Sequence, residues 1–233
     1  MCTLTWWPAN TGGYDLWFNR DERLTRQPEQ APRAGVTTEG MRYLAPVDGD
    51  HGGTWLLLNE HGLTVVILNF YPRGVVESGN ESRGSLPLRC AACDCARDVA
   101  GVLRGVQLQH YAPFHLVAVD ARGEAGHFRW DSRALHEAPA AQFLTSSSFE
   151  PERVQAERKA RFTTWPGRTV EALTRLHYQH DPAAGAESVC MRRPDANTRS
   201  ICTVRVRPHL RELKYQPVEW SGAEWPQAQT QCL

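Results

Sequence analysis

The first 24 residues carry the pattern that most constrains how this chain can fold. Residues 2–7 (Cys-Thr-Leu-Thr-Trp-Trp) are rich in threonine and tryptophan, and residues 14–19 largely alternate apolar with polar side chains. Both patterns are typical of β-strands. Residues 8–13 (Pro-Ala-Asn-Thr-Gly-Gly) lie between them and consist mostly of turn-forming types. We therefore predict an antiparallel hairpin at the start of the chain.

The register of this hairpin decides which side chains meet at its open end. If Trp7 pairs with Tyr14, Cys2 lies opposite Asn19. The thiol and the run Asn-Arg-Asp-Glu at 19–22 then lie at the same end of the ribbon. This juxtaposition makes Cys2 the first candidate for a functional residue.

Apolar periodicity along the remaining chain predicts a mixture of strand pairs and helices. Strands are expected at residues 54–58, 63–70, 114–119, 125–130, 188–192, 201–207 and 213–220, helices at 88–107, 151–162 and 169–180, and a surface loop at 25–50. Strand pairs followed by helices and more strands favour an α+β fold in which helices pack on antiparallel sheets. Because no repeat or linker divides the sequence, we expect a single domain over residues 1–233.

Charge and cysteine usage narrow the classes of partner. Lys and Arg number 26 and Asp and Glu number 26, so no net charge draws the chain to nucleic acid or to an anionic membrane. No apolar run approaches the ~20 residues of a membrane span, which predicts no integral membrane association. The seven cysteines are odd in number and follow no secretory signal, so we expect reduced thiols in a cytoplasmic protein.

Several short motifs, spread over most of the chain, resemble those of one protein family. They are Met-Cys-Thr at 1–3, Asn-Arg-Asp-Glu at 19–22, Gly-Gly-Thr-Trp-Leu at 52–56, Ser-Arg-Gly at 82–84, Val-Cys-Met-Arg-Arg-Pro at 189–194 and Thr-Arg-Ser at 198–200. In this order they resemble the NRDE family, also called the transport and Golgi organisation 2 family. That family is associated with haem mobilisation and with acyl-CoA and lipid homeostasis. The resemblance therefore implies haem or an acyl-CoA as a ligand.

A more distant resemblance concerns the choloylglycine hydrolases and penicillin V acylases. It rests on the initial Met-Cys-Thr, on Asn-Glu-His-Gly-Leu at 59–63 and on Leu-Asn-Phe at 68–70. Those proteins are N-terminal-nucleophile hydrolases with a four-layer αββα sandwich of antiparallel sheets, and their processed N-terminal cysteine attacks amides. The resemblance implies the same fold here, with Cys2 as nucleophile, Arg20 as the arginine beside it and Asn69 as an oxyanion-hole donor.

Two positions differ from the hydrolase pattern. The hydrolases have Arg-x-x-Asp on the second strand, whereas Arg20 is followed at once by Asp21, which makes Asp21 an approximate counterpart of their aspartate. Their second oxyanion asparagine follows a Leu-Thr pair, and after Leu144 and Thr145 this chain has Ser146. A second active-site arginine has no clear match, and whether Arg199 has a role stays open.

The residue types at these positions suit nucleophilic acyl chemistry. Removal of the initiator methionine would give Cys2 a free α-amine, which titrates at about 8 and can accept the thiol proton without a histidine. Arg20 would favour the thiolate, and Asp21 could orient the ammonium. Asn69 could donate a hydrogen bond to an oxyanion, with the Ser146 hydroxyl as a second donor. The competing interpretation makes Cys2 a small buried hydrophobe and Arg20 and Asp21 a structural ion pair.

Further residues near the predicted site are candidates for binding a ligand. They flank the thiol or lie on the segments that frame it: Asn19, Glu22, Trp6, Trp55, His51 and His61. If the ligand is haem, Cys2, His51 or His61 is a candidate axial ligand. The Cys-x-x-Cys-x-Cys run at 90–95 falls on a predicted helix without a second cluster, so we expect no metal site and no required cofactor.

Three functions follow from these patterns. We favour a cysteine-dependent hydrolase or acyl-transfer protein that acts on an amide or thioester of a small, partly apolar molecule. The alternative is a non-catalytic protein that binds and traffics haem, an acyl-CoA or a lipid on the same fold. The third is a scaffold without a small ligand.

Overall fold

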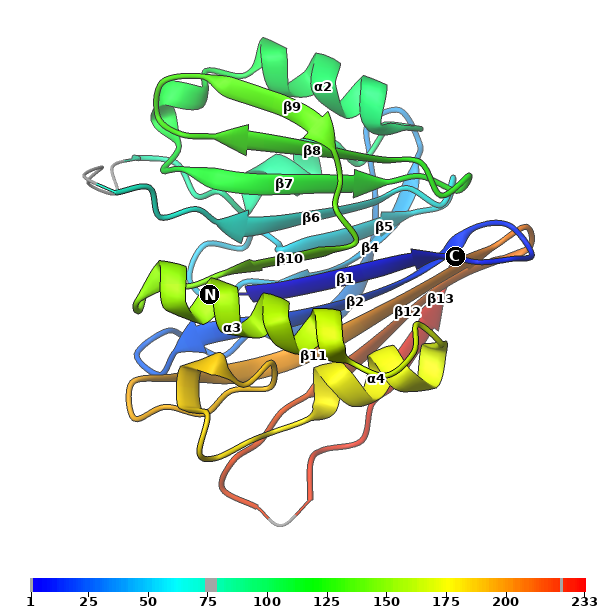
Figure 1. Cartoon of the computed structure of the whole chain (residues 1–233). Helices are drawn as coiled ribbons and strands as arrows, with labels where there is room; N and C mark the ends of the chain where they lie inside the picture. The colour runs from blue at the N-terminus through cyan, green and yellow to red at the C-terminus, as the bar shows by residue number, and fades with distance from the viewer. Residues whose placement is uncertain (1, 74–78, 223) are drawn as a thin grey trace.

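The predicted N-terminal hairpin forms and lies inside a larger sheet. In the computed structural model, which describes residues 2–73, 79–222 and 224–233, its strands are β1 (Cys2–Pro8) and β2 (Tyr14–Arg23). The strand β10 (Phe143–Ser146) pairs with β1, and β11 (Ala196–Arg207) pairs with β2. The end of the chain therefore completes a sheet that its first residues begin (Figure 1).

Two antiparallel sheets make up the central layers of the described residues. The first has six strands in the order β10-β1-β2-β11-β12-β13, with β12 at Leu210–Pro217 and β13 at Gln229–Cys232. The second has seven strands in chain order, namely β3 (Gln30–Val36), β4 (Arg42–Val47), β5 (Leu56–Asn59), β6 (Thr64–Asn69), β7 (Phe114–Val119), β8 (Ala125–Trp130) and β9 (Leu135–Pro139).

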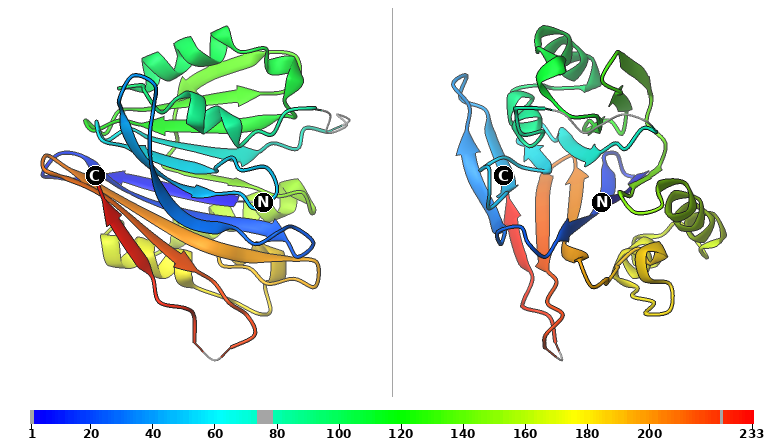
Figure 2. Two further views of the ribbon diagram at one scale, coloured as in Figure 1. Left: turned by 180° about the vertical axis from the view of Figure 1, so that it is seen from behind. Right: turned by 90° about the vertical axis from the view of Figure 1, so that its left-hand side faces the viewer.

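Helices cover the outer faces of both sheets. The helices α3 (Pro151–Thr164) and α4 (Val170–Tyr178) pack on the first sheet, and α1 (Ser85–Arg89) and α2 (Ala96–Gly105) pack on the second. Short 3-10 helices lie at Leu108–His110 and Gly185–Glu187. No helix in the described parts of the chain is long and apolar enough to cross a membrane. The views in Figures 1 and 2 show helices outside and sheets inside, as the predicted αββα sandwich requires.

The main hydrophobic core fills the space between the two sheets. Leu4 and Leu16 of the hairpin and Val66 of β6 belong to this cluster and are fully buried. On the opposite face of the hairpin, Trp17 packs with Leu173 of α4 in a second buried cluster. Strand β2 is therefore buried on both faces, and its successive residues serve two different layers.

The register of the hairpin differs by one residue from the predicted register. Tyr14 pairs with Pro8, not with Trp7, because residues 9–13 alone form the turn. Pro8 is tolerated in the strand because β10 pairs only with residues 2–5 of β1, which leaves Pro8 with a neighbouring strand on one side.

This shift decides which residues share a face with the thiol. Cys2 lies opposite Arg20, whereas Asn19 lies opposite Thr3. Directly opposed residues of an antiparallel pair point to the same side of the sheet. Arg20 therefore joins Cys2 on the side facing the second sheet, and Asn19 joins the side facing the helices. An error of one residue exchanges the two faces of the strand.

Away from the hairpin, several observed elements also differ from the predicted ones. Residues 114–119 and 125–130 form strands as predicted, but the expected loop at 25–50 contains β3 and β4. The strand β3 is a mostly exposed edge strand and so carries little apolar signal. The expected helix at 88–107 is interrupted, because Cys95 and Asp98 cap a new helix at Ala96. The expected strand at 188–192 does not form, and the short strands β9, β10 and β13 are not predicted.

Candidate active site

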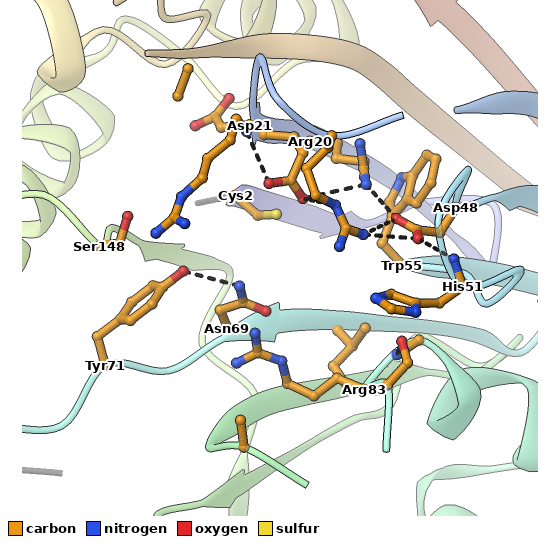
Figure 3. A pocket seen from close by; sticks show the side chains of 18 of the residues that line it. Cys2, Arg20, Asp21, Asp48, His51, Trp55, Asn69, Tyr71, Arg83 and Ser148 are labelled. Carbon is orange, nitrogen blue, oxygen red and sulfur yellow. Dashed lines mark hydrogen bonds and ion pairs between the residues drawn. The ribbon is translucent and has the colours of Figure 1, made fainter. Parts of the chain in front are cut away.

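A cavity of about 560 Å³ opens where the hairpin ends. Cys2 and Arg20 line it from the first sheet, and Ile67 and Asn69 line it from β6 of the second sheet. Figure 3 shows the Cys2 thiol between Arg20 on one side and Asn69 on the other. The cavity therefore lies between the two sheets, and its volume suits a small organic molecule.

Cys2 begins β1 and has a strand partner on each side. Arg20 of β2 and Ser146 of β10 lie directly opposite it, so the three side chains share one face. The residue is 8% exposed, and burial raises the pKa of its thiol to about 11. The charge of Asp21 raises this pKa further, whereas Arg20 lowers it by less than burial raises it. The thiol is therefore protonated at neutral pH and needs a proton acceptor to become a nucleophile.

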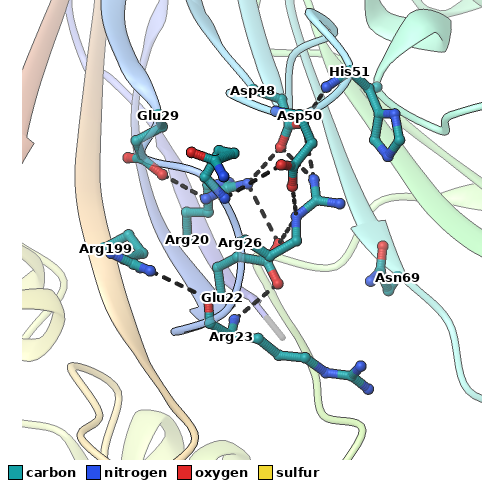
Figure 4. Close-up of polar contacts among 12 residues, drawn as sticks. Arg20, Glu22, Arg23, Arg26, Glu29, Asp48, Asp50, His51, Asn69 and Arg199 are labelled. Atoms are coloured by element: carbon teal, nitrogen blue, oxygen red, sulfur yellow. Dashed lines mark hydrogen bonds and ion pairs between the residues drawn. The ribbon is translucent and has the colours of Figure 1, made fainter.

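The guanidinium of Arg20 is shared among three carboxylates. Its Nη1 donates to Glu29 at 2.6 Å, and its Nη2 donates to Asp48 at 2.7 Å and to Glu22 at 3.3 Å. The group also lies 4.3 Å from the centre of the Trp55 ring. Burial alone would lower the pKa of Arg20, but the carboxylates raise it above its ordinary value. Arg20 is thus fixed beside the thiol, and negative charge surrounds it (Figure 4).

Arg26 extends this cluster along the cavity wall. Its Nη2 donates to Asp48 at 2.7 Å, and its Nε lies 2.7 Å from Asp50. The backbone N–H of His51 donates to Asp48 at 3.0 Å. Burial alone would raise the pKa of Asp48, but the charges of Arg20 and Arg26 lower it. The wall beside the thiol is therefore a network of ion pairs in which carboxylates outnumber guanidiniums.

The opposite wall presents neutral and basic donors. Asn69 donates from Nδ2 to the hydroxyl of Tyr71 at 3.0 Å, and the same amide nitrogen carries a second N–H. Arg83 donates from Nη1 to the carbonyl of Pro113 at 2.9 Å. In Figure 3 the Asn69, Tyr71 and Arg83 side chains lie on the same side of the cavity, across from Arg20. A carbonyl bound between the walls would meet the thiol from one side and these donors from the other.

Two serines lie at the end of the strand beside Cys2: Ser146 is the last residue of β10, and Ser148 follows two residues later. Ser146 is buried, and its hydroxyl has no hydrogen-bond partner in the described part of the chain, but it does not line the cavity. Ser148 does line the cavity. Sequence reasoning names Ser146 alone, whereas the two-residue period of an extended chain could have pointed to Ser148 as well.

Comparison with known proteins places the chain in a family. The family model described as Transport and Golgi organisation 2 matches residues 1–172, well over half of the 233 residues. The chain belongs to this family. No curated protein matches the chain closely enough to add to this assignment.

Solved structures share the fold of this transport and Golgi organisation 2 family member at low sequence identity. The C2A mutant of the conjugated bile acid hydrolase from Clostridium perfringens has a TM-score of 0.60 and 14% identity, covering 100% of this chain and 92% of that chain. Penicillin V acylase from Agrobacterium tumefaciens has a TM-score of 0.54 and 13% identity, covering 93% and 83%. The Caenorhabditis elegans orthologue of N-acylethanolamine-hydrolyzing acid amidase has a TM-score of 0.60 and 10% identity, covering 88% and 92%. The shared fold is that of N-terminal-nucleophile hydrolases.

In this family member, Asn19 faces away from the cavity and is fully buried under α4. Its Nδ2 donates to the carbonyls of His177 at 2.8 Å and Val189 at 3.1 Å, and its Oδ1 accepts from Nδ1 of His177 at 2.6 Å. The hydroxyl of Thr5 lies 2.7 Å from Nε2 of His177, which fits a ring with its proton on Nδ1. Burial lowers the pKa of His177 to about 3, so the ring is neutral. Asn19 therefore anchors a helix to the sheet.

Asp21 also directs its carboxylate to the helical side. Its Oδ1 accepts from the hydroxyl of Thr198 at 2.6 Å, and its Oδ2 accepts from Nη1 of Arg158 at 3.0 Å. Arg158 of α3 is fully buried and also donates to Thr3 at 2.7 Å and to the carbonyl of Ala186 at 3.0 Å. Sequence reasoning misses Arg158, because a single arginine on a polar helix carries no mark of pointing inward. Asp21 borders the cavity, but its carboxylate joins β2, β11 and α3.

The predicted ligand-binding residues divide into two groups. Glu22, His51 and Trp55 line the cavity. Asn19, Trp6 and His61 do not line it. Trp6 lies four residues beyond Cys2 along β1, away from the cavity. It packs in the core there and donates from Nε1 to the carbonyl of Ala141 at 3.1 Å. His61 is exposed in the turn between β5 and β6, where its ring contacts the carboxylate of Asp94.

Two further expectations concern residues outside the cavity. Arg199 does not line it and donates from Nη2 to the carbonyls of Arg23 at 3.2 Å and Leu24 at 3.3 Å, so it holds the backbone after β2. The cysteine run at 90–95 lies between α1 and α2. Across the residues that the structure describes, no group of three or more His, Cys, Asp and Glu side chains is arranged to hold a metal ion.

Proposed function

We propose that the chain is a cysteine-dependent hydrolase or acyl-transfer protein that acts on an amide or thioester of a small, partly apolar molecule. One observation carries the proposal: Cys2, which methionine removal would make the first residue, lines a cavity of about 560 Å³ between the sheets. Trp55, Ile67 and Phe149 give the cavity apolar surface. The family and the hydrolase fold agree with this proposal.

The proposed mechanism begins with removal of Met1, which frees the α-amine of Cys2. Because burial keeps the thiol protonated, the sulfur needs an acceptor, and the free amine lies on the same residue. The amine takes the thiol proton as the sulfur attacks the carbonyl carbon, and a C–S bond and a tetrahedral oxyanion form. Asn69, which lines the cavity, donates to this oxyanion through an amide N–H.

The second half of the reaction returns the proton. The ammonium of Cys2 protonates the leaving amine or thiol as its bond to the acyl carbon breaks, and an S-acyl cysteine remains. Water, or an acceptor in acyl transfer, then attacks the thioester while the amine again accepts a proton. Arg20 and Asp21 act here as positioning residues, since Arg20 is fixed beside the sulfur and Asp21 fixes the strand end that carries the ammonium.

Intact mass and cysteine labelling test this proposal together. We expect native protein to lack Met1 and to take up a cysteine-directed acylating reagent at Cys2. Cys2→Ala removes this labelling and lowers thioester hydrolysis by about a thousandfold or more. Cys232→Ser, which removes an exposed thiol instead, keeps both. Complete retention of Met1 on the native protein would contradict the mechanism.

A non-catalytic binding role is the second candidate, and the state of the thiol favours it. A thiol with a pKa of about 11, beside an arginine bound to three carboxylates, suits a binding wall. For haem, Cys2 and His51 are candidate ligands in the cavity, whereas His61 lies outside it. Titration of the purified protein with haem tests this role. A Soret shift that Cys2→Ala or His51→Ala abolishes supports it, and the absence of any shift rejects haem as the ligand.

We also propose that the protein works in the cytoplasm. All seven cysteines are free thiols, which fits a reducing compartment. Cell fractionation tests the location, and recovery of the native protein from an oxidising compartment would contradict it.

A further inference from the structure

The charged residues that line the cavity are evenly balanced but unevenly paired. Five arginines and five acidic residues line it, so their formal charges cancel. Each of the five carboxylates has a cation or a hydroxyl as partner: Glu22 and Asp48 with Arg20, Asp21 with Arg158, Asp195 with Arg193 and Glu81 with Tyr111. Every carboxylate that lines the cavity therefore already has a partner within the protein.

Arg23 is the exception among the cavity arginines. It ends β2, its side chain is exposed, and that side chain makes no hydrogen bond or ion pair with the residues that the structure describes. Its backbone, in contrast, is held firmly. It pairs with Ala196, and its carbonyl accepts from Nη2 of Arg199 at 3.2 Å and from the N–H of Arg26 at 3.2 Å. Figure 4 shows the side chain leaving the ion-pair cluster and extending toward the side on which Asn69 lies.

Two anchored arginines face the same space. Arg83 lies across the cavity, on the side of Asn69, with its Nη1 on the carbonyl of Pro113 at 2.9 Å. Arg193 pairs with Asp195 at 2.7 Å and lies 4.4 Å from the ring of Phe149. The mouth of the cavity thus holds the Arg23 guanidinium, which makes no hydrogen bond or ion pair with the described residues, and those of Arg83 and Arg193, which are fixed by contacts within the protein.

We propose that the cavity mouth around Arg23 and Arg83 binds an anionic group, a carboxylate, sulfonate or phosphate, of the molecule whose carbonyl meets Cys2. The proposal rests on the cysteine chemistry proposed above. A guanidinium binds such groups through two parallel N–H···O bonds, whereas a neutral ligand leaves Arg23 in water. The subsite therefore selects charged substrates by affinity and holds them with the acyl bond near the sulfur.

Matched thioesters test the subsite and locate the anion. One pair compares the glutaryl and pentanoyl thioesters of thiophenol, which places the charge on the acyl side. The other compares the pentanoyl thioesters of 3-mercaptopropionate and butanethiol, which places it on the leaving group. We expect wild-type protein to prefer the anionic member of one pair by about tenfold in kcat/KM, mainly through KM. Arg23→Gln brings this ratio close to one, whereas Arg133→Gln, an exposed arginine outside the cavity lining, retains it.

Binding to the Cys2→Ala protein gives a readout that needs no turnover. By titration calorimetry, we expect it to bind the anionic thioester about tenfold more tightly than its neutral match, and to lose this difference when Arg23→Gln is added. If wild-type protein turns over no thioester while Cys2→Ala still discriminates, the cysteine chemistry fails and the anion subsite stands. The subsite is refuted if Cys2→Ala binds no anionic thioester, or if discrimination survives Arg23→Gln.

Discussion

The two faces of strand β2 divide one short run of residues between two tasks. Arg20 and Glu22 face the cavity, whereas Asn19 and Asp21 direct their polar groups to the helices. On the cavity face, three carboxylates share the single guanidinium of Arg20. At the cavity end of the helical face the partners are buried instead, such as Arg158 and Thr198 for Asp21. The alternation of a β-strand thus separates residues that hold the helices to the sheet from residues that line the cavity.

Of the substitutions considered on either face of β2, Asp21→Ala should lower the free energy of unfolding the most. The substitution leaves the guanidinium of Arg158 buried without its carboxylate, and water cannot reach it. We expect a loss of about 3–5 kcal/mol in the free energy of unfolding, measured by urea denaturation. The added substitution Arg158→Met restores a large part of this loss because it removes the unpaired charge.

Asp15→Ala is the matched control on the same strand and the same face. Its partners Arg205 and Arg207 are 40% and 23% exposed, so water replaces the lost carboxylate. We expect a loss of about 1 kcal/mol. Equal losses for Asp15→Ala and Asp21→Ala would show that burial of the partner does not set the cost.

Arg20→Met asks whether the cavity face also supports the fold. The substitution removes the ion-pair partner of the Glu29 and Asp48 carboxylates, whose side chains are 6% and 12% exposed. We expect a smaller loss, about 2–3 kcal/mol, because the cavity admits water to part of the cluster and Arg26 still pairs with Asp48. Adding Asp48→Asn recovers part of it. A loss as large as that of Asp21→Ala would break the distinction between the faces.

The location of the site follows from the sequence more readily than the orientation of its residues. Turn chemistry and strand alternation predict the hairpin and bring Cys2 to residues 19–22. The face of each residue depends on the register, which a turn one residue shorter changes, and so Asn19 was expected beside the ligand. Arg158 and the strand β3 escape prediction for a different reason. Their roles depend on tertiary burial and on an edge position, which local patterns do not encode.

The pH dependence of stability probes the histidine beneath Asn19. Burial lowers the pKa of His177, and likewise of His115, to about 3 in the folded protein, so the unfolded chain binds more protons below pH ~6.5. Stability therefore falls as the pH falls from about 6.5 to 5, with each of these two histidines costing about 2 kcal/mol at pH 5. Carboxylates titrate mainly below this window.

His177→Gln separates this contribution from the others. Urea unfolding at several pH values between about 5 and 6.5 should show a shallower decline for His177→Gln, because one of the two groups no longer binds a proton on unfolding. His115→Gln, on β7, flattens the decline by a similar amount, and the double variant flattens it further. An unchanged decline in His177→Gln would show that the ring is charged when folded, contrary to its hydrogen bonds with Asn19 and Thr5.

Glu22→Gln has the smallest expected effect on stability and sharpens the comparison most directly. Glu22 is the longest of the three contacts to Arg20, at 3.3 Å, and its side chain is 25% exposed, so we expect a change within about 0.5 kcal/mol. Removing this carboxylate leaves more of the Arg20 charge uncompensated near the sulfur, which favours the thiolate. The pKa of Cys2, read from the pH dependence of its alkylation rate, should therefore fall, with Cys2→Ala as the blank. A pKa that rises or stays fixed would show that the cluster around Arg20 positions the strand without acting on the thiol.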